Sequence, residues 1–163
     1  MRLSTRGRYG VRAIYELATR YGKGPVPLKE IAERQAIPEH YLEQLMATLR
    51  KAGIVTSVRG AQGGYELARP PSEISVGEVV RVVEGPISLA ECVGDLSSTD
   101  GCERADECAM RLLWERLRDC INRVLDSTNF EALSLISSPR RRCSDEESLP
   151  GSCCDNANAP RGA

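Results

Sequence analysis

Between Leu28 and Ala68 the chain places two short helical segments directly before a glycine-rich hairpin, a combination that few folds contain. PLKEIAERQ and EHYLEQLMATLRK both repeat apolar residues at helical spacing, and Pro38 stands where the second helix would begin. IVTSV (54–58) and YELA (65–68) have the length of short strands and flank the turn RGAQGG. The segment therefore predicts a helix pair joined by a tight turn, followed by a two-stranded hairpin.

Further helical segments lie on both sides of this unit. TRGRYGVRAIYELATRY precedes it, with Ser4 or Thr5 available as N-cap, and Gly22, Gly24 and Pro25 end that helix. After the hairpin, VGEVVRVVEG predicts another short helix that ends at Gly85. Residues 1–85 thus predict a mainly α, winged helix-turn-helix domain with a two-stranded wing. In such a domain the second helix of the pair enters a DNA major groove.

The charge of the chain is divided between its two halves. Residues 1–69 contain 12 Lys and Arg against 6 Asp and Glu, whereas residues 70–163 contain 10 against 17. This asymmetry suggests that the first half faces a polyanion. A solvated charged face would give the same composition, and a small protein-binding domain would share the helices. The helix pair, the hairpin and the positive charge together favour double-stranded DNA.

We expect the DNA contacts to come from the start of the chain, the helix pair and the wing. On the second helix, Glu43 and Gln44 face away from the apolar stripe, so they are placed to read bases. Arg59 at the wing tip can enter a minor groove or hold a phosphate. The full set of expected DNA-binding residues is Arg2, Ser4, Thr5, Tyr9, Leu28, Pro38, His40, Tyr41, Glu43, Gln44, Arg50, Lys51, Arg59, Gly60, Ala61 and Gln62.

The longest uninterrupted helical pattern runs from Asp106 to Ser127. A helix of this length, about 30 Å, would overhang a small domain unless a second copy of the chain covers its apolar stripe. Segment 106–137 is therefore expected to hold a dimerisation helix and a packing helix that starts with a Thr128/Glu131 capping box. The tail, 139–163, has little apolar content and should be disordered. The expected dimerisation residues are Leu113, Leu117, Cys120, Ile121 and Val124.

Three of the seven cysteines, Cys92, Cys102 and Cys108, lie in the Gly-, Ser- and Asp-containing segment 86–108. The chain shows no signal peptide and is expected in the cytoplasm, where clustered thiols bind metal or do redox chemistry more often than they form disulfides. Their spacing favours a metal or cluster site but leaves reduced structural thiols open. Cys120 lies on an apolar helix stripe and is expected in the core. The tail cysteines Cys143, Cys153 and Cys154 have no evident partner.

The sequence resembles the family of IscR-type iron–sulfur transcriptional regulators, a winged-helix superfamily with NsrR, RirA and CymR. The resemblance spans residues 1–137 and lies in MRLSTRGRYGVRAIYELA, YLEQL, LRKAGIVTSVRG, GGYELARPPSEISVGEVV and the three cysteines before LLWERL. It implies a homodimer that binds a palindromic operator and holds a [2Fe–2S] cluster through Cys92, Cys102 and Cys108. It also implies that iron–sulfur assembly proteins supply the cluster.

The fourth cluster ligand departs from the family pattern. Relatives use a histidine three residues after the third cysteine, or a carboxylate or histidine from the partner's first helix, but this chain has Arg111, Arg8 and Arg12. A guanidinium has no lone pair to donate. We name Glu43 as the expected ligand, with a carboxylate of the cysteine segment (Asp100, Glu103, Asp106 or Glu107) or a non-protein ligand as open alternatives.

The function expected from these features is a DNA-binding regulator, mainly a repressor, that senses cluster status and controls cluster-biogenesis genes. Two alternatives remain open: a related regulator that senses NO or redox stress through its cluster, and a cluster-free regulator controlled by a partner protein. An enzyme is not expected, because the chain has one His, no nucleophile motif and no phosphate loop.

Overall fold

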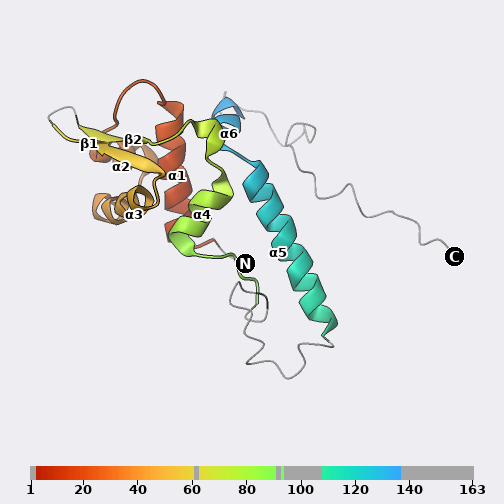
Figure 1. Ribbon diagram of the computed structural model, residues 1–163. Helices are drawn as coiled ribbons and strands as arrows, with labels where there is room; N and C mark the ends of the chain where they lie inside the picture. Colours follow the sequence, from red (N-terminus) through yellow and green to blue (C-terminus); the bar gives the residue numbers. More distant parts are fainter. Residues whose placement is uncertain (1–2, 61–62, 91–92, 94–107, 137–163) are drawn as a thin grey trace.

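The computed structural model describes residues 3–60, 63–90, 93 and 108–136 (Figure 1). Expectations for the other residues, including Arg2, Ala61, Gln62, Cys92, Cys102 and the tail from 139 to 163, lie outside this part of the chain. The elements are α1 (Thr5–Thr19), α2 (Leu28–Gln35), α3 (Glu39–Lys51), β1 (Val55–Val58), β2 (Gly64–Leu67), the 3₁₀ turn η1 (Pro71–Glu73), α4 (Val76–Glu84), α5 (Ala109–Ser127) and α6 (Phe130–Ile136). The expected mainly α winged-helix fold is confirmed.

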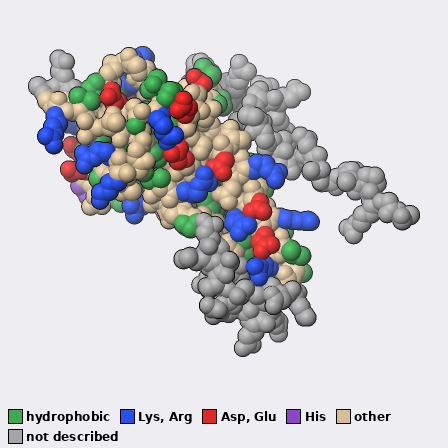
Figure 2. All heavy atoms as spheres, in the orientation of Figure 1, with side chains coloured by type: hydrophobic (Ala, Val, Ile, Leu, Met, Phe, Trp, Pro, Cys, Tyr) green, Lys and Arg blue, Asp and Glu red, His purple; other side chains and the backbone are tan. Residues whose placement is uncertain are grey.

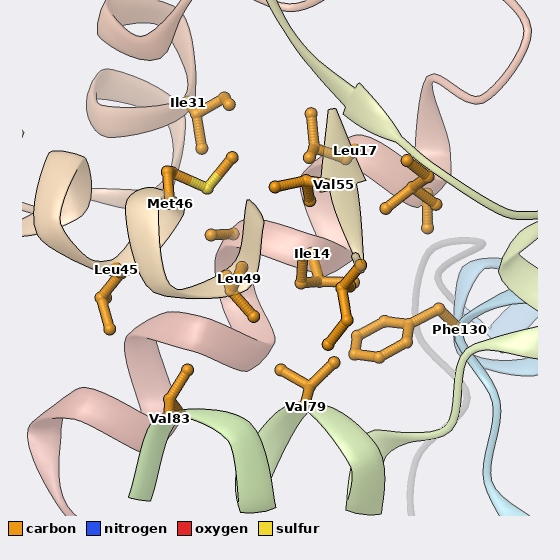
Figure 3. Close-up of a cluster of buried hydrophobic side chains, with 14 of the residues drawn as sticks. Ile14, Leu17, Ile31, Leu45, Met46, Leu49, Val55, Val79, Val83 and Phe130 are labelled. Atoms are coloured by element: carbon orange, nitrogen blue, oxygen red, sulfur yellow. The ribbon is translucent and has the colours of Figure 1, made fainter. Parts of the chain in front are cut away.

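The first three helices pack around one apolar core. Ser4 is the N-cap of α1, where its side chain accepts hydrogen bonds from the backbone N–H groups of Arg6 and Gly7. The turn between α2 and α3 is tight because Ala36 takes a left-handed conformation, with φ of 48°. Figure 3 shows the core that results, with side chains from α1, α2, α3 and α4 pointing toward one another. Its fully buried members include Ile14, Ile31, Leu42, Met46, Leu49 and Val79.

The wing is an antiparallel hairpin whose second strand is attached to the α1–α2 loop. Val55 pairs with Leu67, and Val58 pairs with Gly64. Near the start of β2, Val26 and Tyr65 exchange two backbone hydrogen bonds of 2.9 Å. Gly64 makes this approach possible, because a Cβ on it would lie 2.3 Å from the Val26 carbonyl oxygen. The strands each differ by one residue at their ends from those expected, a shift within the usual uncertainty of strand boundaries.

Helix α5 is attached to the domain at its C-terminal end and extends away from it at its N-terminal end (Figure 1). The attachment includes the Arg81–Asp126 ion pair of 2.5 Å and the hydrogen bond of 2.9 Å from the Val76 N–H to the Thr128 carbonyl oxygen. Phe130, the first residue of α6, is fully buried, and losing such a side chain from a core costs about 3–5 kcal/mol. This aromatic residue fixes the end of α5 to the core of the winged helix.

The cap of α6 differs from the expected one. The Asn129 Oδ1 atom accepts the backbone N–H of Ala132 at 2.8 Å, whereas the Thr128 hydroxyl donates to the Val124 carbonyl. The expected Thr128/Glu131 capping box is therefore wrong. Thr128 is still bound to the last turn of α5, so its side chain is not available to α6.

None of the helices in the described ranges combines the length and apolar character needed to cross a membrane.

Candidate nucleic-acid interface

Helix α3 divides cleanly into a buried and an exposed face. Leu42, Leu45, Met46 and Leu49 are at most 2% exposed, and they fix the rotation of the helix about its axis. The opposite face presents His40, Glu43 and Gln44 to solvent. These are three of the residues expected to contact DNA, and their donors and acceptors match what base edges in a major groove offer.

The first two turns of α1 lie against one side of α3. The Tyr9 and Tyr41 rings meet edge-to-face, with centroids 5.7 Å apart and planes at 80°. One turn earlier, the Arg6 Nη2 atom lies 3.5 Å from the Thr48 hydroxyl. Between these two contacts is a cavity of about 120 Å³, lined by Arg6, Tyr41, Gln44, Leu45 and Thr48. The N-terminal end of α1 and the exposed face of α3 therefore form one continuous surface.

Arg6 and Thr48 are members of this surface that the sequence analysis did not select. Arg6 carries the charge needed for a phosphate contact, and Thr48 follows Gln44 by one helical turn. The four arginines among the first twelve residues were a signal for Arg6, whereas nothing in the sequence linked it to Thr48, 42 residues later.

The wing continues the surface beyond α3. Arg50 at the end of α3 donates to the Ser57 hydroxyl at 3.2 Å, which connects the helix to β1. Arg59 is exposed, and Gly60 has φ of +117°, a conformation that favours glycine. Figure 2 shows Lys and Arg side chains gathered at the end of the molecule that carries α3 and the hairpin. Ala61 and Gln62, also expected to contact DNA, lie outside the described residues.

The other expected DNA-binding residues lie at helix starts. Ser4 and Thr5 begin α1, Leu28 begins α2, and Pro38 is the N-cap of α3. Lys51 is the exposed last residue of α3. Leu28 is half-buried, and its side chain packs against the core.

Cys108 is the one member of the expected cysteine site within the described residues. It is half-buried, is the N-cap of α5 and carries a free thiol. Val93, which follows Cys92 in the chain, is 2% exposed, and its carbonyl accepts a hydrogen bond of 3.4 Å from Arg118 of α5. The same helix thus holds Cys108 and the residue next to Cys92. No group of three or more His, Cys, Asp or Glu able to hold a metal occurs among the described residues.

The residues considered for the fourth ligand position are separated or already paired. Arg111 Nε is 3.0 Å from the Glu115 carboxylate, one turn along α5. Arg12 donates to Gln35 of α2 at 3.4 Å. Glu43 is exposed on α3, and Figure 1 shows α3 and the start of α5 at opposite ends of the molecule. Its ligand role stays a prediction, and we expect any ligation by Glu43 to come from a second copy of the chain.

Helix α5 has no buried residue and exposes a line of large apolar side chains. Leu113, Leu117 and Val124 of the expected dimerisation set are 44%, 41% and 40% exposed. Cys120 is half-buried, and Ile121 packs partly against the core of its own domain. Most of the exposed stripe lies in the N-terminal half of α5, where Met110 and Leu112 extend it, and Val124 is exposed near the C-terminal end.

The family model described as "Rrf2: Iron-dependent Transcriptional regulator" matches residues 3–134. The chain belongs to the Rrf2 family. It is similar to the HTH-type transcriptional regulator CymR of Bacillus subtilis, at 48% identity over 82% of this chain and 90% of the relative. It is also similar to the regulator IscR of Photorhabdus laumondii, at 44% identity over 82% and 79%. The solved structure of T. potens IscR matches with a TM-score of 0.69 and 43% identity, over 87% of this chain and 93% of that one.

As an Rrf2-family member, the chain is a DNA-binding transcriptional regulator with a winged helix. Family membership confirms the expected resemblance to IscR and CymR, and it agrees with a role other than enzyme. The relatives carry both names at similar identity, so the question specific to this chain is what its cysteines do.

Proposed function

We propose that this Rrf2 protein is a dimeric repressor whose binding to a palindromic operator depends on a [2Fe–2S] cluster held by Cys92, Cys102 and Cys108. The observation that carries the proposal is the placement of the free, half-buried Cys108 thiol at the N-cap of α5. The thiolate is the form of cysteine that binds iron, and Cys108 directly follows the segment that contains Cys92 and Cys102. Cys92 precedes Val93, whose carbonyl is bound to the same helix.

The residues around Cys108 are compatible with a cluster. Arg111 is paired with Glu115, so its charge does not stand unbalanced beside the thiol, and it supplies no ligand. When bound, the cluster would supply iron- and redox-sensitive charge in a segment joined directly to α4 and α5. Iron–sulfur assembly proteins are the proposed donors, and cluster-biogenesis genes are the proposed targets. The proposed fourth ligand is Glu43 of a second copy, with a carboxylate of the cysteine segment or a non-protein ligand as the alternatives.

A cluster-free regulator controlled by a partner protein is the second candidate. It is favoured by the 48% identity to CymR, which lacks a cluster. Against it, this chain has cysteines at the three positions that the resemblance to the IscR group implies as ligands. A regulator that uses the same cluster to sense NO or redox stress differs only in its signal.

Iron content separates these candidates. The purified chain should be reconstituted anaerobically with iron and sulfide, alongside Cys92→Ala, Cys102→Ala and Cys108→Ala variants and a Cys143→Ala control from the tail. We expect two irons per chain and a visible charge-transfer spectrum in the wild type and the control, and loss of both in the three variants. A wild type that retains no iron but still binds an operator would support the cluster-free candidate.

A further inference from the structure

The N-terminus of α1 receives a cap from a residue far along the chain. Glu84 is the last residue of α4, and its Oε1 atom accepts the backbone N–H of Ser4 at 2.8 Å and that of Gly7 at 3.0 Å. In a capping box, the residue at the third helical position reaches back to the N–H of the N-cap residue. In α1 that position is Gly7, which has no side chain, and Glu84 makes the bond in its place.

Two glycines of α1 lie where Val83 and Glu84 of α4 pack against the helix. A Cβ on Gly7 would lie 2.1 Å from Glu84 Oε1, so only glycine admits the carboxylate at this point. One turn on, a Cβ on Gly10 would lie 3.2 Å from the methyl groups of Val83. Two glycines of α1 therefore allow the last turn of α4 to approach the helix backbone. Gly85, with φ of +91°, ends α4 directly after the capping residue.

The turn of α1 that Glu84 holds is the turn that meets α3. Arg6 lies between Ser4 and Gly7, the two residues whose N–H groups Glu84 binds, and it reaches Thr48 of α3. Tyr9, half a turn beyond Gly7, packs against Tyr41. A displacement of this first turn would move Arg6 and Tyr9 together, and with them the α1 part of the DNA-binding surface.

We propose that Glu84 is a positioning residue for DNA binding: its carboxylate fixes the first turn of α1 so that Arg6 is held at the phosphate backbone beside α3. The proposal rests on the DNA-binding function above and assigns to it a residue that does not touch DNA. Removal of the Glu84 side chain should therefore weaken DNA binding. Charge alone predicts the opposite, because removing a carboxylate from a DNA-binding protein strengthens its attraction to a polyanion.

Three variants test this role: Glu84→Ala, Glu84→Gln and the matched control Ser75→Ala. Ser75 caps the other end of α4 by accepting the Glu78 N–H at 3.0 Å, so its loss removes a cap from the same helix without touching α1. Dissociation constants should be measured by fluorescence anisotropy on a palindromic duplex selected from a random pool with the wild-type protein. Circular dichroism at the same temperature would establish that each variant is folded.

We expect Glu84→Ala to weaken binding about tenfold, as for loss of one well-placed cap. Glu84→Gln keeps an acceptor oxygen but loses the charge, and it should bind at least as tightly as the wild type. Ser75→Ala should keep wild-type affinity. Equal or tighter binding by Glu84→Ala would overturn the proposal, as would an equal loss in Ser75→Ala, which would reveal a general effect of stability.

A double variant tests whether Glu84 acts through Arg6. If it does, adding Glu84→Ala to Arg6→Ala should weaken binding little beyond Arg6→Ala alone, because the side chain being positioned is already absent. Losses that multiply fully would overturn the proposal. If the wild type selects no duplex at all, the DNA-binding function itself fails, and that result is distinct from each of the outcomes above.

Discussion

Gln44 and Arg59 are both exposed on the proposed DNA surface, yet their side chains suit different contacts. The Gln44 amide offers a donor and an acceptor, which pair with the edge of adenine in a major groove. Arg59 lies at the wing, where a minor groove or a phosphate is within reach of its long side chain. We therefore expect Gln44 to read bases and Arg59 to have a less sequence-dependent role.

Gln44→Ala should therefore alter sequence preference at one base pair of each half-site by about 1–3 kcal/mol. Binding to a panel of operators with single substitutions would measure the preference of wild type and variant. Arg59→Ala is the comparison, since it should weaken all operators more evenly. An even loss across the panel for Gln44→Ala would count against base reading.

The burial of single residues could be predicted from the sequence, but their long-range contacts could not. Apolar spacing correctly predicted which side of α3 is buried, because burial follows helical periodicity. It did not predict that Arg6 meets Thr48 or that Glu84 caps Ser4, since those pairs are 42 and 80 residues apart. Such contacts depend on how helices pack, which composition and local spacing do not determine.

At the scale of elements, the helices and both strands were predicted from local signals, and the errors lie at their ends. Pro38 and Gly85 were correctly predicted to mark the start of α3 and the end of α4. The cap of α6 was not, because Thr128 and Asn129 are adjacent and both are good N-caps. The attachment of the hairpin to the α1–α2 loop had no sequence signal except the glycine at position 64.

Gly64→Ala should destabilise the domain by about 1–3 kcal/mol, because its Cβ would collide with the Val26 carbonyl and separate the hairpin from the loop. Chemical denaturation followed by circular dichroism would measure the loss. Gly22→Ala is the comparison: nothing lies within 4 Å of the added Cβ, so its cost of about 1–2 kcal/mol should come from the positive φ of 78° alone. Wild-type stability in Gly64→Ala would show that no collision occurs at Gly64.

For the molecule as a whole, the exposed stripe of α5 requires a cover, and we expect a second copy of the chain to provide it. Leu113→Asp/Leu117→Asp should give monomers in sedimentation, since both side chains are more than 40% exposed and neither supports the core of its own domain. Ile121, also expected at the interface, packs partly on that core, so its substitution would confuse dimerisation with folding. Arg123→Asp, exposed on α5 beside the stripe, controls for added charge. A double variant that stays dimeric would place the interface elsewhere.

The same monomeric variant decides where the fourth cluster ligand originates. Because α3 and the start of α5 lie at opposite ends of one chain, ligation by Glu43 requires a dimer, whereas Glu103 belongs to the cysteine segment itself. If Glu43 ligates, the Glu43→Ala, Glu43→Gln and Leu113→Asp/Leu117→Asp variants should share an altered cluster spectrum and a shorter cluster lifetime after anaerobic reconstitution. Glu103→Ala should then match the wild type. An unchanged spectrum in both Glu43 variants would remove this glutamate from the coordination sphere and leave it the role of reading DNA, where a carboxylate accepts a hydrogen bond from cytosine.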